Sequence, residues 1–211
     1  MQTNQPLAPT PAAVSGGHPP HRLTRADLMT LETYARERDA FRARVLAHKR
    51  LRNLSVGPHT TWCFEDRLTV QYQIQEMLRA ERIFEGDAIQ EELDSYNPLI
   101  PDGSNWKATL LIEYPDVDDR RVALGKLRGI ERRCWVGVAG ERAFAIADED
   151  LERENEEKTS AVHFLRFELS SSARAAAKAG AAIELGIDHP EYRYSVTVGA
   201  ESARLLAADL D

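Results

Sequence analysis

The sequence is poor in cysteine and has no long apolar segment. Its two cysteines, Cys63 and Cys134, match none of the CxxC spacings of metal-binding or redox motifs, which argues against a disulfide framework or a thiolate metal site. No segment approaches the roughly 18 consecutive apolar residues of a membrane helix, and the N-terminus lacks the apolar core of a signal peptide. We therefore expect a cytoplasmic protein whose thiols are ordinary buried side chains.

The sequence motifs of several large enzyme classes are also absent. The chain contains no GxGxxG before a helix, no Walker loop, no GxSxG elbow and no HExxH. Dinucleotide-dependent oxidoreductases, P-loop NTPases, α/β-hydrolases and zincins are therefore not expected. There is no basic excess either. The net charge of −7 argues against a dedicated nucleic-acid-binding protein, which needs cations to displace counterions from phosphates.

Two segments differ in composition from the rest of the chain. Residues 1–22 hold five of the ten prolines and no acidic residue, so they cannot bury enough apolar surface to offset the entropy of ordering, and we predict a disordered tail. Residues 148–158 hold seven acidic residues against one arginine and one lysine, which leaves a local net charge of −5. We expect this acidic stretch to be a linker.

The region 23–104 is predicted to be mainly helical. Thr24, with Asp27 three residues later, approximates a capping box, and apolar residues follow at helical spacing. Residues 60–64 are aromatic and β-branched enough to form a short strand. Asp66 can then cap a longer helix that carries one continuous apolar stripe.

From residue 105 to the C-terminus the pattern changes to strands, and the order of elements repeats. Each repeat reads strand, helix, strand, strand, a βαββ unit. The predicted elements span 108–114, 120–127, 134–138 and 143–147 in the first unit, and 162–169, 171–179, 183–187 and 192–198 in the second. The second unit alternates cleanly between apolar and polar residues, which is typical of strands with one buried face.

We therefore predict an α+β fold. A helical N-terminal half is followed by two βαββ units that form a mostly antiparallel sheet of about six strands with helices on one side. The regions 23–104 and 105–211 are expected to pack together as one domain, and the acidic stretch would connect the two units.

Three phrases of the sequence resemble a known family: YQIQEMLR at 72–79, YNPLIPDGS at 96–104 and KTSAVHF at 158–164. From about Leu23 to the C-terminus the chain resembles the uncharacterised bacterial family called domain of unknown function 3501. Genes of this family often lie beside genes of rubrerythrin-like proteins and iron–sulfur oxidoreductases. The resemblance therefore implies a setting in redox or peroxide metabolism and redox proteins as partners, but it implies no activity.

His163 is the first candidate for a functional site. In the phrase VHFLRFEL it shares a strand face with Leu165 and Phe167, while Arg166 and Glu168 point the other way. A buried imidazole needs a hydrogen-bond partner or a metal, because leaving it unpaired costs about 1–3 kcal/mol. Two interpretations remain open: a histidine at the edge of the core bonded to a carbonyl or carboxylate, or a ligand-binding or metal-binding residue.

The helix around Glu76 is the second candidate, because polar residues lie beside its apolar stripe. In one interpretation Glu76 and Arg79 form a pair three residues apart on a solvated face, worth on the order of a few tenths of a kcal/mol. In the other, Glu76 lies in a polar pocket as a metal ligand or general base, and Arg79 binds an anionic group.

His48 and His59 flank a turn and complete the set of candidates. Together with Glu76 and His163 they could form a site of histidines and a carboxylate that iron or zinc accepts, although no spacing requires it. The basic residues near His48 are expected on the solvated face of a helix, although such a run could also hold a phosphate or a nucleic acid. They are Arg42, Arg44, Lys49, Arg50 and Arg52.

Two functions from different classes remain open. The first is a non-catalytic accessory or binding protein that acts with redox partners, such as rubrerythrin-like proteins or an iron–sulfur oxidoreductase. The second is a metal-dependent enzyme or metal-binding protein that uses iron or zinc at a site of His163 and Glu76 with His59 or His48. Neither needs a membrane, and a homodimer is compatible with both.

Overall fold

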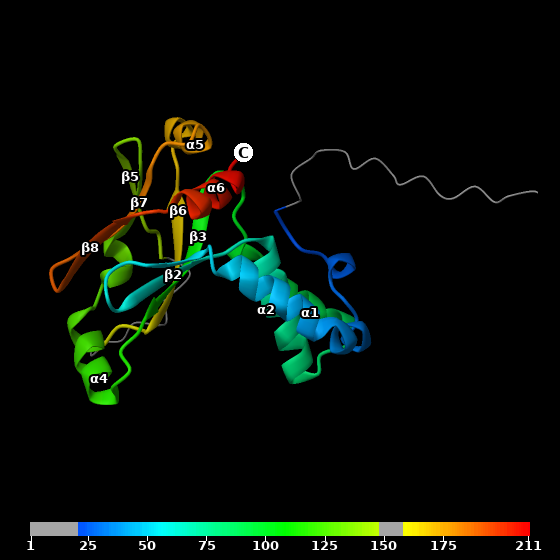
Figure 1. Ribbon diagram of the computed structural model, residues 1–211. Helices are drawn as coiled ribbons and strands as arrows, with labels where there is room; N and C mark the ends of the chain where they lie inside the picture. Colours follow the sequence, from blue (N-terminus) through cyan, green and yellow to red (C-terminus); the bar gives the residue numbers. More distant parts are fainter. Residues whose placement is uncertain (1–20, 148–157) are drawn as a thin grey trace, which may run out of the picture.

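The N-terminal region is helical, as the sequence predicts (Figure 1). The structure is a computed structural model and describes residues 21–147 and 158–211. Thr24 and Asp27 form the predicted capping box, but it begins only a single 3-10 turn, and the first long helix starts after the Thr30 cap. The helices of this region are α1 (Leu31–Lys49), α2 (Arg67–Glu81) and α3 (Gly86–Tyr96).

Two sequence predictions concern residues that lie mostly outside the described ranges. These are the tail predicted for 1–22 and the acidic stretch 148–158. Of the tail, the structure describes His21 and Arg22. The His21 ring donates from Nδ1 to the Pro101 carbonyl at 3.0 Å, so this residue contacts the domain.

Helix α2 begins at the residue that the sequence predicts. The Asp66 carboxylate accepts the Thr69 amide at 2.9 Å, and the Thr69 hydroxyl accepts the Asp66 amide at the same distance. Three buried residues follow at helical spacing: Val70, Ile74 and Leu78. The cap at Asp66 and the apolar stripe are therefore confirmed.

The strands form two antiparallel four-stranded sheets instead of one sheet. The first has the order β1-β2-β3-β6, with β1 (Asn53–Ser55), β2 (Thr60–Phe64), β3 (Asn105–Ile112) and β6 (Val162–Glu168). The second has the order β5-β4-β7-β8, with β4 (Cys134–Val138), β5 (Glu141–Phe144), β7 (Ile183–His189) and β8 (Tyr192–Thr197). The prediction of a single sheet was wrong. The alternation of apolar and polar residues shows which face of a strand is buried, but it does not show which strands lie beside it.

The α+β class and the order of elements in the two βαββ units are confirmed. The first unit is β3, α4 (Val117–Lys126), β4 and β5, and the second is β6, α5 (Ser171–Lys178), β7 and β8. The strands β3 and β6 pair with each other, and so do β4 and β7, while β5 and β8 lie at the two edges of the second sheet. This is the pattern of two units related by an approximate two-fold rotation, so α4 and α5 occupy equivalent places.

The inner faces of the two sheets share one apolar core. Trp62 and Leu110 from the first sheet and Val136 and Leu185 from the second are fully buried in it. Helix α2 packs on the other face of the first sheet, where it contacts Phe164. The first sheet therefore lies between the N-terminal helices and the second sheet (Figure 1).

The C-terminal helix, α6 (Ala200–Ala208), is bonded to the start of the first βαββ unit. The Trp106 indole donates to the Leu206 carbonyl at 2.8 Å, and the Asp211 amide donates to the Gly103 carbonyl at 2.9 Å. None of the helices in the described part of the chain is both long enough and apolar enough to cross a membrane.

Candidate ligand-binding site

The structure does not bring the predicted metal ligands together. Among the described residues, no three His, Cys, Asp or Glu side chains form a group that could hold a metal ion. The side chains considered for iron or zinc, His163, Glu76, His59 and His48, therefore do not form one centre. Each has its own set of neighbours, which shows what it does in the fold.

The Glu76 carboxylate is bound by two residues of helix α1. The Tyr34 hydroxyl donates to it at 2.5 Å, and Arg38 donates from Nε and Nη2 at 2.8 and 2.7 Å. The Arg38 hydrogen bonds, together with that of Tyr34, lower the pKa of Glu76 to about 2. Exposed Arg79 contributes to this pKa only through its charge. Glu76 therefore joins α1 to α2 as an ionised carboxylate whose oxygens already accept three bonds.

Replacing Glu76 by glutamine is expected to destabilise the protein at neutral pH but not at very low pH. The pKa of Glu76 is depressed in the folded protein from 4.5 to about 2, so its stabilising effect is complete above about pH 4.5 and is lost as the pH falls through about 2. Because the carboxylate is 27% exposed, we expect a loss on the order of 1–2 kcal/mol at pH 7. Denaturant unfolding at several pH values measures it.

The control for this experiment is Glu81→Gln, at the exposed end of the same helix. Its stability should follow that of the wild type within about 0.5 kcal/mol at every pH. A gap between Glu76→Gln and wild type that stays constant from pH 5 to pH 2 would contradict the assigned pKa.

His163 lies on the buried face of β6, as the sequence predicts, and faces the core between the sheets. Its Nε2 lies 3.0 Å from both the Thr159 hydroxyl and the Ser160 carbonyl. The next residue, Phe164, points to the opposite face and packs with α2. The first sheet therefore separates the His163 ring from the helix that carries Glu76.

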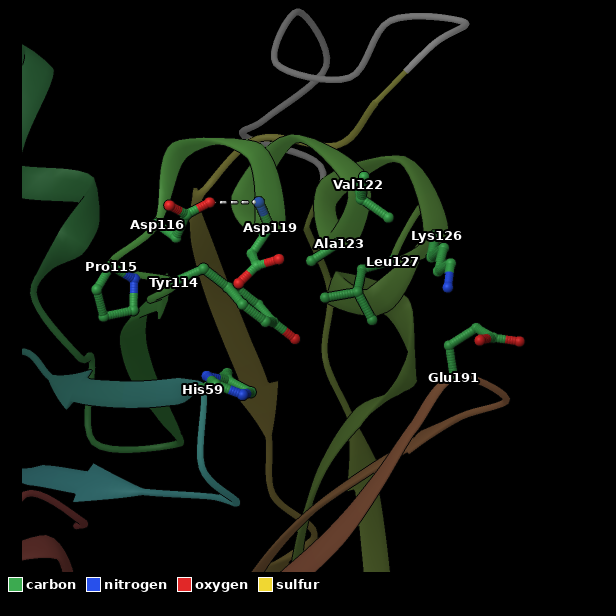
Figure 2. Close-up of a pocket in the computed structure, with 10 residues that line it drawn as sticks. All are labelled: His59, Tyr114, Pro115, Asp116, Asp119, Val122, Ala123, Lys126, Leu127 and Glu191. Carbon is green, nitrogen blue, oxygen red and sulfur yellow. Dashed lines mark hydrogen bonds between the residues drawn. The ribbon is translucent and has the colours of Figure 1, made fainter.

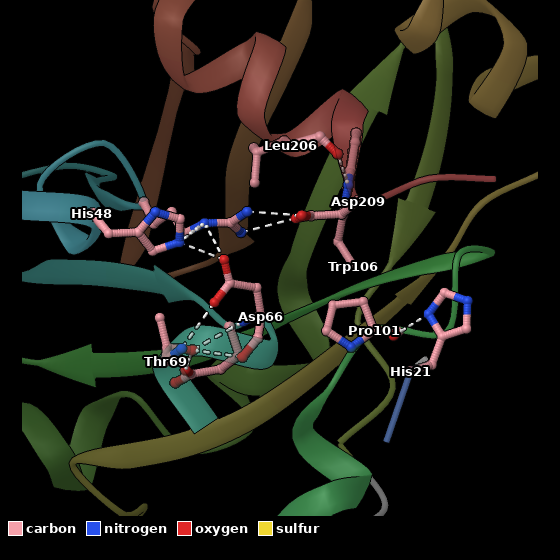
Figure 3. A network of polar contacts seen from close by, with 10 residues as sticks. His21, His48, Asp66, Thr69, Pro101, Trp106, Leu206 and Asp209 are labelled. Atoms are coloured by element: carbon pink, nitrogen blue, oxygen red, sulfur yellow. Dashed lines mark hydrogen bonds and ion pairs between the residues drawn. The ribbon is translucent and has the colours of Figure 1, made fainter. Parts of the chain in front are cut away.

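His48 belongs to a network of charged side chains at the N-terminus of α2 (Figure 3). Its Nε2 is hydrogen-bonded to the Asp66 carboxylate and lies 3.0 Å from Nε of Arg52, which donates to it. The Arg52 guanidinium also forms an ion pair with Asp66, with its Nε 2.9 Å from the same carboxylate. Burial opposes the ionisation of Asp66, but the His48 hydrogen bond and the Arg52 charge outweigh burial and lower its pKa. His48 thus helps to hold the cap of α2.

Arg52 connects this network to the C-terminal helix. It donates from Nη1 and Nη2 to the Asp209 carboxylate at 2.8 and 2.7 Å, and it is only 3% exposed. The expectation that Arg52 lies on a solvated basic face was therefore wrong. Its partner Asp209 is 157 residues away in the chain, so helical spacing alone could not reveal the pairing.

His59 lies at a cavity between α4, the end of β3 and the β7–β8 turn (Figure 2). We call this cavity the α4 pocket. Its volume is about 440 Å³, within the range of small-molecule sites. It is lined by His59, Tyr114, Pro115, Asp116, Asp119, Val122, Ala123, Lys126, Leu127 and Glu191.

The start of α4 determines which residues line the α4 pocket. Asp116 caps the helix by accepting the amides of residues 118 and 119 at 2.9 and 3.0 Å. Because α4 begins at this cap, a stripe of four residues at the helical spacing i, i+3, i+4 and i+7 faces the cavity. The stripe consists of Asp119, Val122, Ala123 and Lys126. Sequence reasoning missed it, because charged residues on a helix are usually solvated.

An aromatic pair forms one wall of the α4 pocket. The rings of His59 and Tyr114 are stacked, with centroids 4.0 Å apart and an angle of 19° between their planes. Two further bonds fix His59: its ring donates from Nδ1 to the Glu113 carbonyl at 3.2 Å, and its backbone amide donates to the Tyr192 hydroxyl at 2.9 Å. Burial raises the pKa of Tyr114, so the phenol remains neutral at physiological pH.

Three charged side chains of the α4 pocket make no internal bonds. Within the described ranges, the side chains of Asp119, Lys126 and Glu191 have neither a hydrogen bond nor an ion pair. Figure 2 shows the Asp119 carboxylate directed toward the Tyr114 ring, while Lys126 and Glu191 lie opposite each other at the other side of the cavity. The α4 pocket therefore combines an aromatic wall with charges that are available to a ligand.

The comparisons with known proteins identify the family. A model of the family described as "Protein of unknown function (DUF3501)" matches residues 22–210. The chain belongs to the DUF3501 family. The resemblance seen in the three sequence phrases is thereby confirmed, and the match covers both the helical region and the two βαββ units. No curated protein matches the chain.

A solved structure is similar to this DUF3501 member over most of its length. It is the crystal structure, at 1.90 Å resolution, of a novel protein of unknown function from Burkholderia pseudomallei K96243. The two sequences are 53% identical, the TM-score is 0.85, and the alignment covers 90% of this chain and 99% of that one. The fold is therefore shared by the two proteins.

Proposed function

We propose that this protein is a cytoplasmic, non-catalytic binding protein that holds a small organic ligand in the α4 pocket. The observation that carries the proposal is the cavity of about 440 Å³, where a stacked His59–Tyr114 wall faces charged side chains without internal partners. Apolar walls with a few converging polar groups are typical of sites that bind small molecules.

A binding role is favoured over catalysis because Glu76, the general-base candidate from the sequence, is used inside the protein. Glu76 is bound by Arg38 and Tyr34, and Asp66 is bound by His48 and Arg52. A general base needs a lone pair directed at a substrate, and neither carboxylate lines the α4 pocket. The metal-dependent alternative is not favoured, because no group of three ligands exists among the residues that the structure describes.

The proposed setting is redox or peroxide metabolism. This part of the proposal follows from the family resemblance, because genes of the family often lie beside genes of rubrerythrin-like proteins and iron–sulfur oxidoreductases. In that setting the binding protein would act as an accessory to such an enzyme. The ligand in the α4 pocket would be the signal to which the binding protein responds.

The proposal predicts that small aromatic compounds bind in the α4 pocket. The full chain, labelled with nitrogen-15, is titrated with a set of cationic, neutral and anionic aromatic fragments while the amide resonances are recorded by NMR. At least one fragment should shift the amides of 117–126 and of the β7–β8 turn. The Val122→Trp variant should abolish these shifts, because an indole at this lining position fills the cavity.

The matched control is Arg121→Trp, which adds the same bulk to the neighbouring residue, exposed and outside the lining of the α4 pocket. It should bind the fragment like the wild type. If no fragment shifts these amides, or if Val122→Trp binds as well as Arg121→Trp, the α4 pocket is not a ligand site.

A further inference from the structure

Because the two βαββ units are related by an approximate two-fold rotation, the region around helix α5 in the second unit corresponds to the region around helix α4 in the first. Ser170 caps α5, and its hydroxyl donates to Glu141 at 2.6 Å. The Ser172 hydroxyl donates to the other oxygen of the same carboxylate at 2.7 Å. Glu141 follows directly after the β4–β5 turn. In the second unit, therefore, the acidic residue of the facing hairpin is bonded to the start of the helix.

At the helix cap the first unit has Asp116 where the second has Ser170, and two residues later it has Asp118 where the second has Ser172. Asp119, one turn after the cap, lines the α4 pocket, and Glu191 of the β7–β8 turn lines it opposite Lys126, at the other end of α4 (Figure 2). Ionised carboxylates only accept hydrogen bonds, so they cannot bond to one another as Ser170 and Glu141 do. The carboxylates of the first unit therefore face a cavity instead of closing it.

We infer that the α4 pocket binds an organic cation, namely an amine with a flat apolar body. This inference rests on the proposed function and names the ligand class of the same site. The lining holds three carboxylates, of Asp116, Asp119 and Glu191, against the single ammonium group of Lys126. Because these groups give the lining a net negative charge, a cationic ligand is favoured over an anionic one.

The aromatic wall suits the same ligand. A cation over the face of a tyrosine ring is attracted by its negative π surface, at distances up to about 6 Å from the centroid. The Asp119 carboxylate is directed toward the Tyr114 ring (Figure 2), so an ammonium group placed between them would contact both. Val122 of α4 and Leu127, the residue just after the helix, also line the cavity and offer apolar surface to the body of the ligand.

The spacing of the carboxylates selects an organic cation over a metal ion. A metal needs three or more ligand atoms at about 2.0–2.6 Å from one point. The described part of the chain contains no such group, so Asp116, Asp119 and Glu191 do not converge on a single ion. An amine of several non-hydrogen atoms can span the cavity that separates them.

The inference is tested with three probes of similar shape and different charge: phenethylamine, phenethyl alcohol and phenylpropionate. Their affinities for the full chain are measured at pH 7 by NMR titration, following the amides of 117–126. The amine should bind about tenfold more tightly than the alcohol, and the carboxylate most weakly.

Two variants of α4 should change the amine affinity in opposite directions. Asp119→Asn should weaken amine binding about tenfold and leave alcohol binding unchanged, while Lys126→Gln should strengthen amine binding a few-fold. The control is Asp118→Asn, whose side chain is 86% exposed, pairs with Arg121 and does not line the cavity. It should behave like the wild type. Melting curves of each variant show that it is folded.

The possible results separate this inference from the proposed function. If phenylpropionate binds in the cavity more tightly than phenethylamine, or if Asp119→Asn binds the amine as well as Asp118→Asn does, the ligand is not a cation, but the α4 pocket remains a binding site. If none of the three probes shifts the amides of 117–126 and the broader fragment set also fails, the proposed function is wrong as well.

Discussion

Replacing Arg52 by methionine is expected to lower the free energy of unfolding by about 3–5 kcal/mol. Arg52 is 3% exposed and bonds to Asp66 on one side and to Asp209 on the other. Methionine fills a similar volume but supplies neither charge nor donors, so two largely buried carboxylates lose their main counterion. Urea unfolding at pH 7 measures the loss, and Arg50→Met, at the exposed neighbouring helix end, should change stability by less than about 0.5 kcal/mol.

The loss in Arg52→Met should also depend on pH in a defined direction. Burial already raises the pKa of Asp209, although Arg52 opposes this effect. Without the guanidinium, the pKa of Asp209 should rise further above its unfolded value, and the pKa of Asp66 should rise as well. The stability deficit should therefore shrink as the pH falls below about 4, where the carboxylates become neutral. A deficit that is equal at pH 7 and pH 3, or no larger than that of Arg50→Met, would show that the network does not hold α6.

The sequence was sufficient to predict the local structure of this protein. The Asp66 cap, the apolar stripe of α2 and the order of elements in both βαββ units depend on residues close together in the chain, and the structure confirms them. The division of the strands into two sheets depends on pairs such as β4 with β7, which are about 50 residues apart. Alternation along a strand contains no information about such pairs.

The site was less predictable than the fold, for the same physical reason. The partners of Glu76 are 38 and 42 residues away, and the partner of Arg52 is 157 residues away. His59 was selected as a possible metal ligand, whereas it forms an aromatic wall with Tyr114. The β7–β8 turn that closes the α4 pocket belongs to the second unit, so Glu191 has no sequence relation to the helix that it faces.

The two units thus use one topology for different purposes. At α5 the hydroxyls of Ser170 and Ser172 bind the facing carboxylate and close the gap between helix and hairpin. At α4 the corresponding gap is open and lined by charged side chains.

Replacing Gly186 by alanine is expected to lower the free energy of unfolding by about 1–3 kcal/mol. Gly186 lies directly opposite Trp135 on the outer face of the second sheet, and the indole lies flat against it. A Cβ atom at Gly186 would be 2.1 Å from Cζ2 of the indole, so the ring would have to move. Trp135 is only 3% exposed, and the Arg142 guanidinium lies over its ring at 3.8 Å from the centroid, which limits the freedom of the ring to move.

A double-mutant cycle separates this steric effect from other effects of alanine in a strand. In a Trp135→Leu background the smaller side chain leaves room for the added methyl group, so Gly186→Ala should cost less than it does beside the indole. Ser195→Ala, at the exposed position paired with Gly186 in β8, should be nearly neutral. Equal costs of Gly186→Ala in the two backgrounds would show that contact with Trp135 is not the reason for glycine at this position.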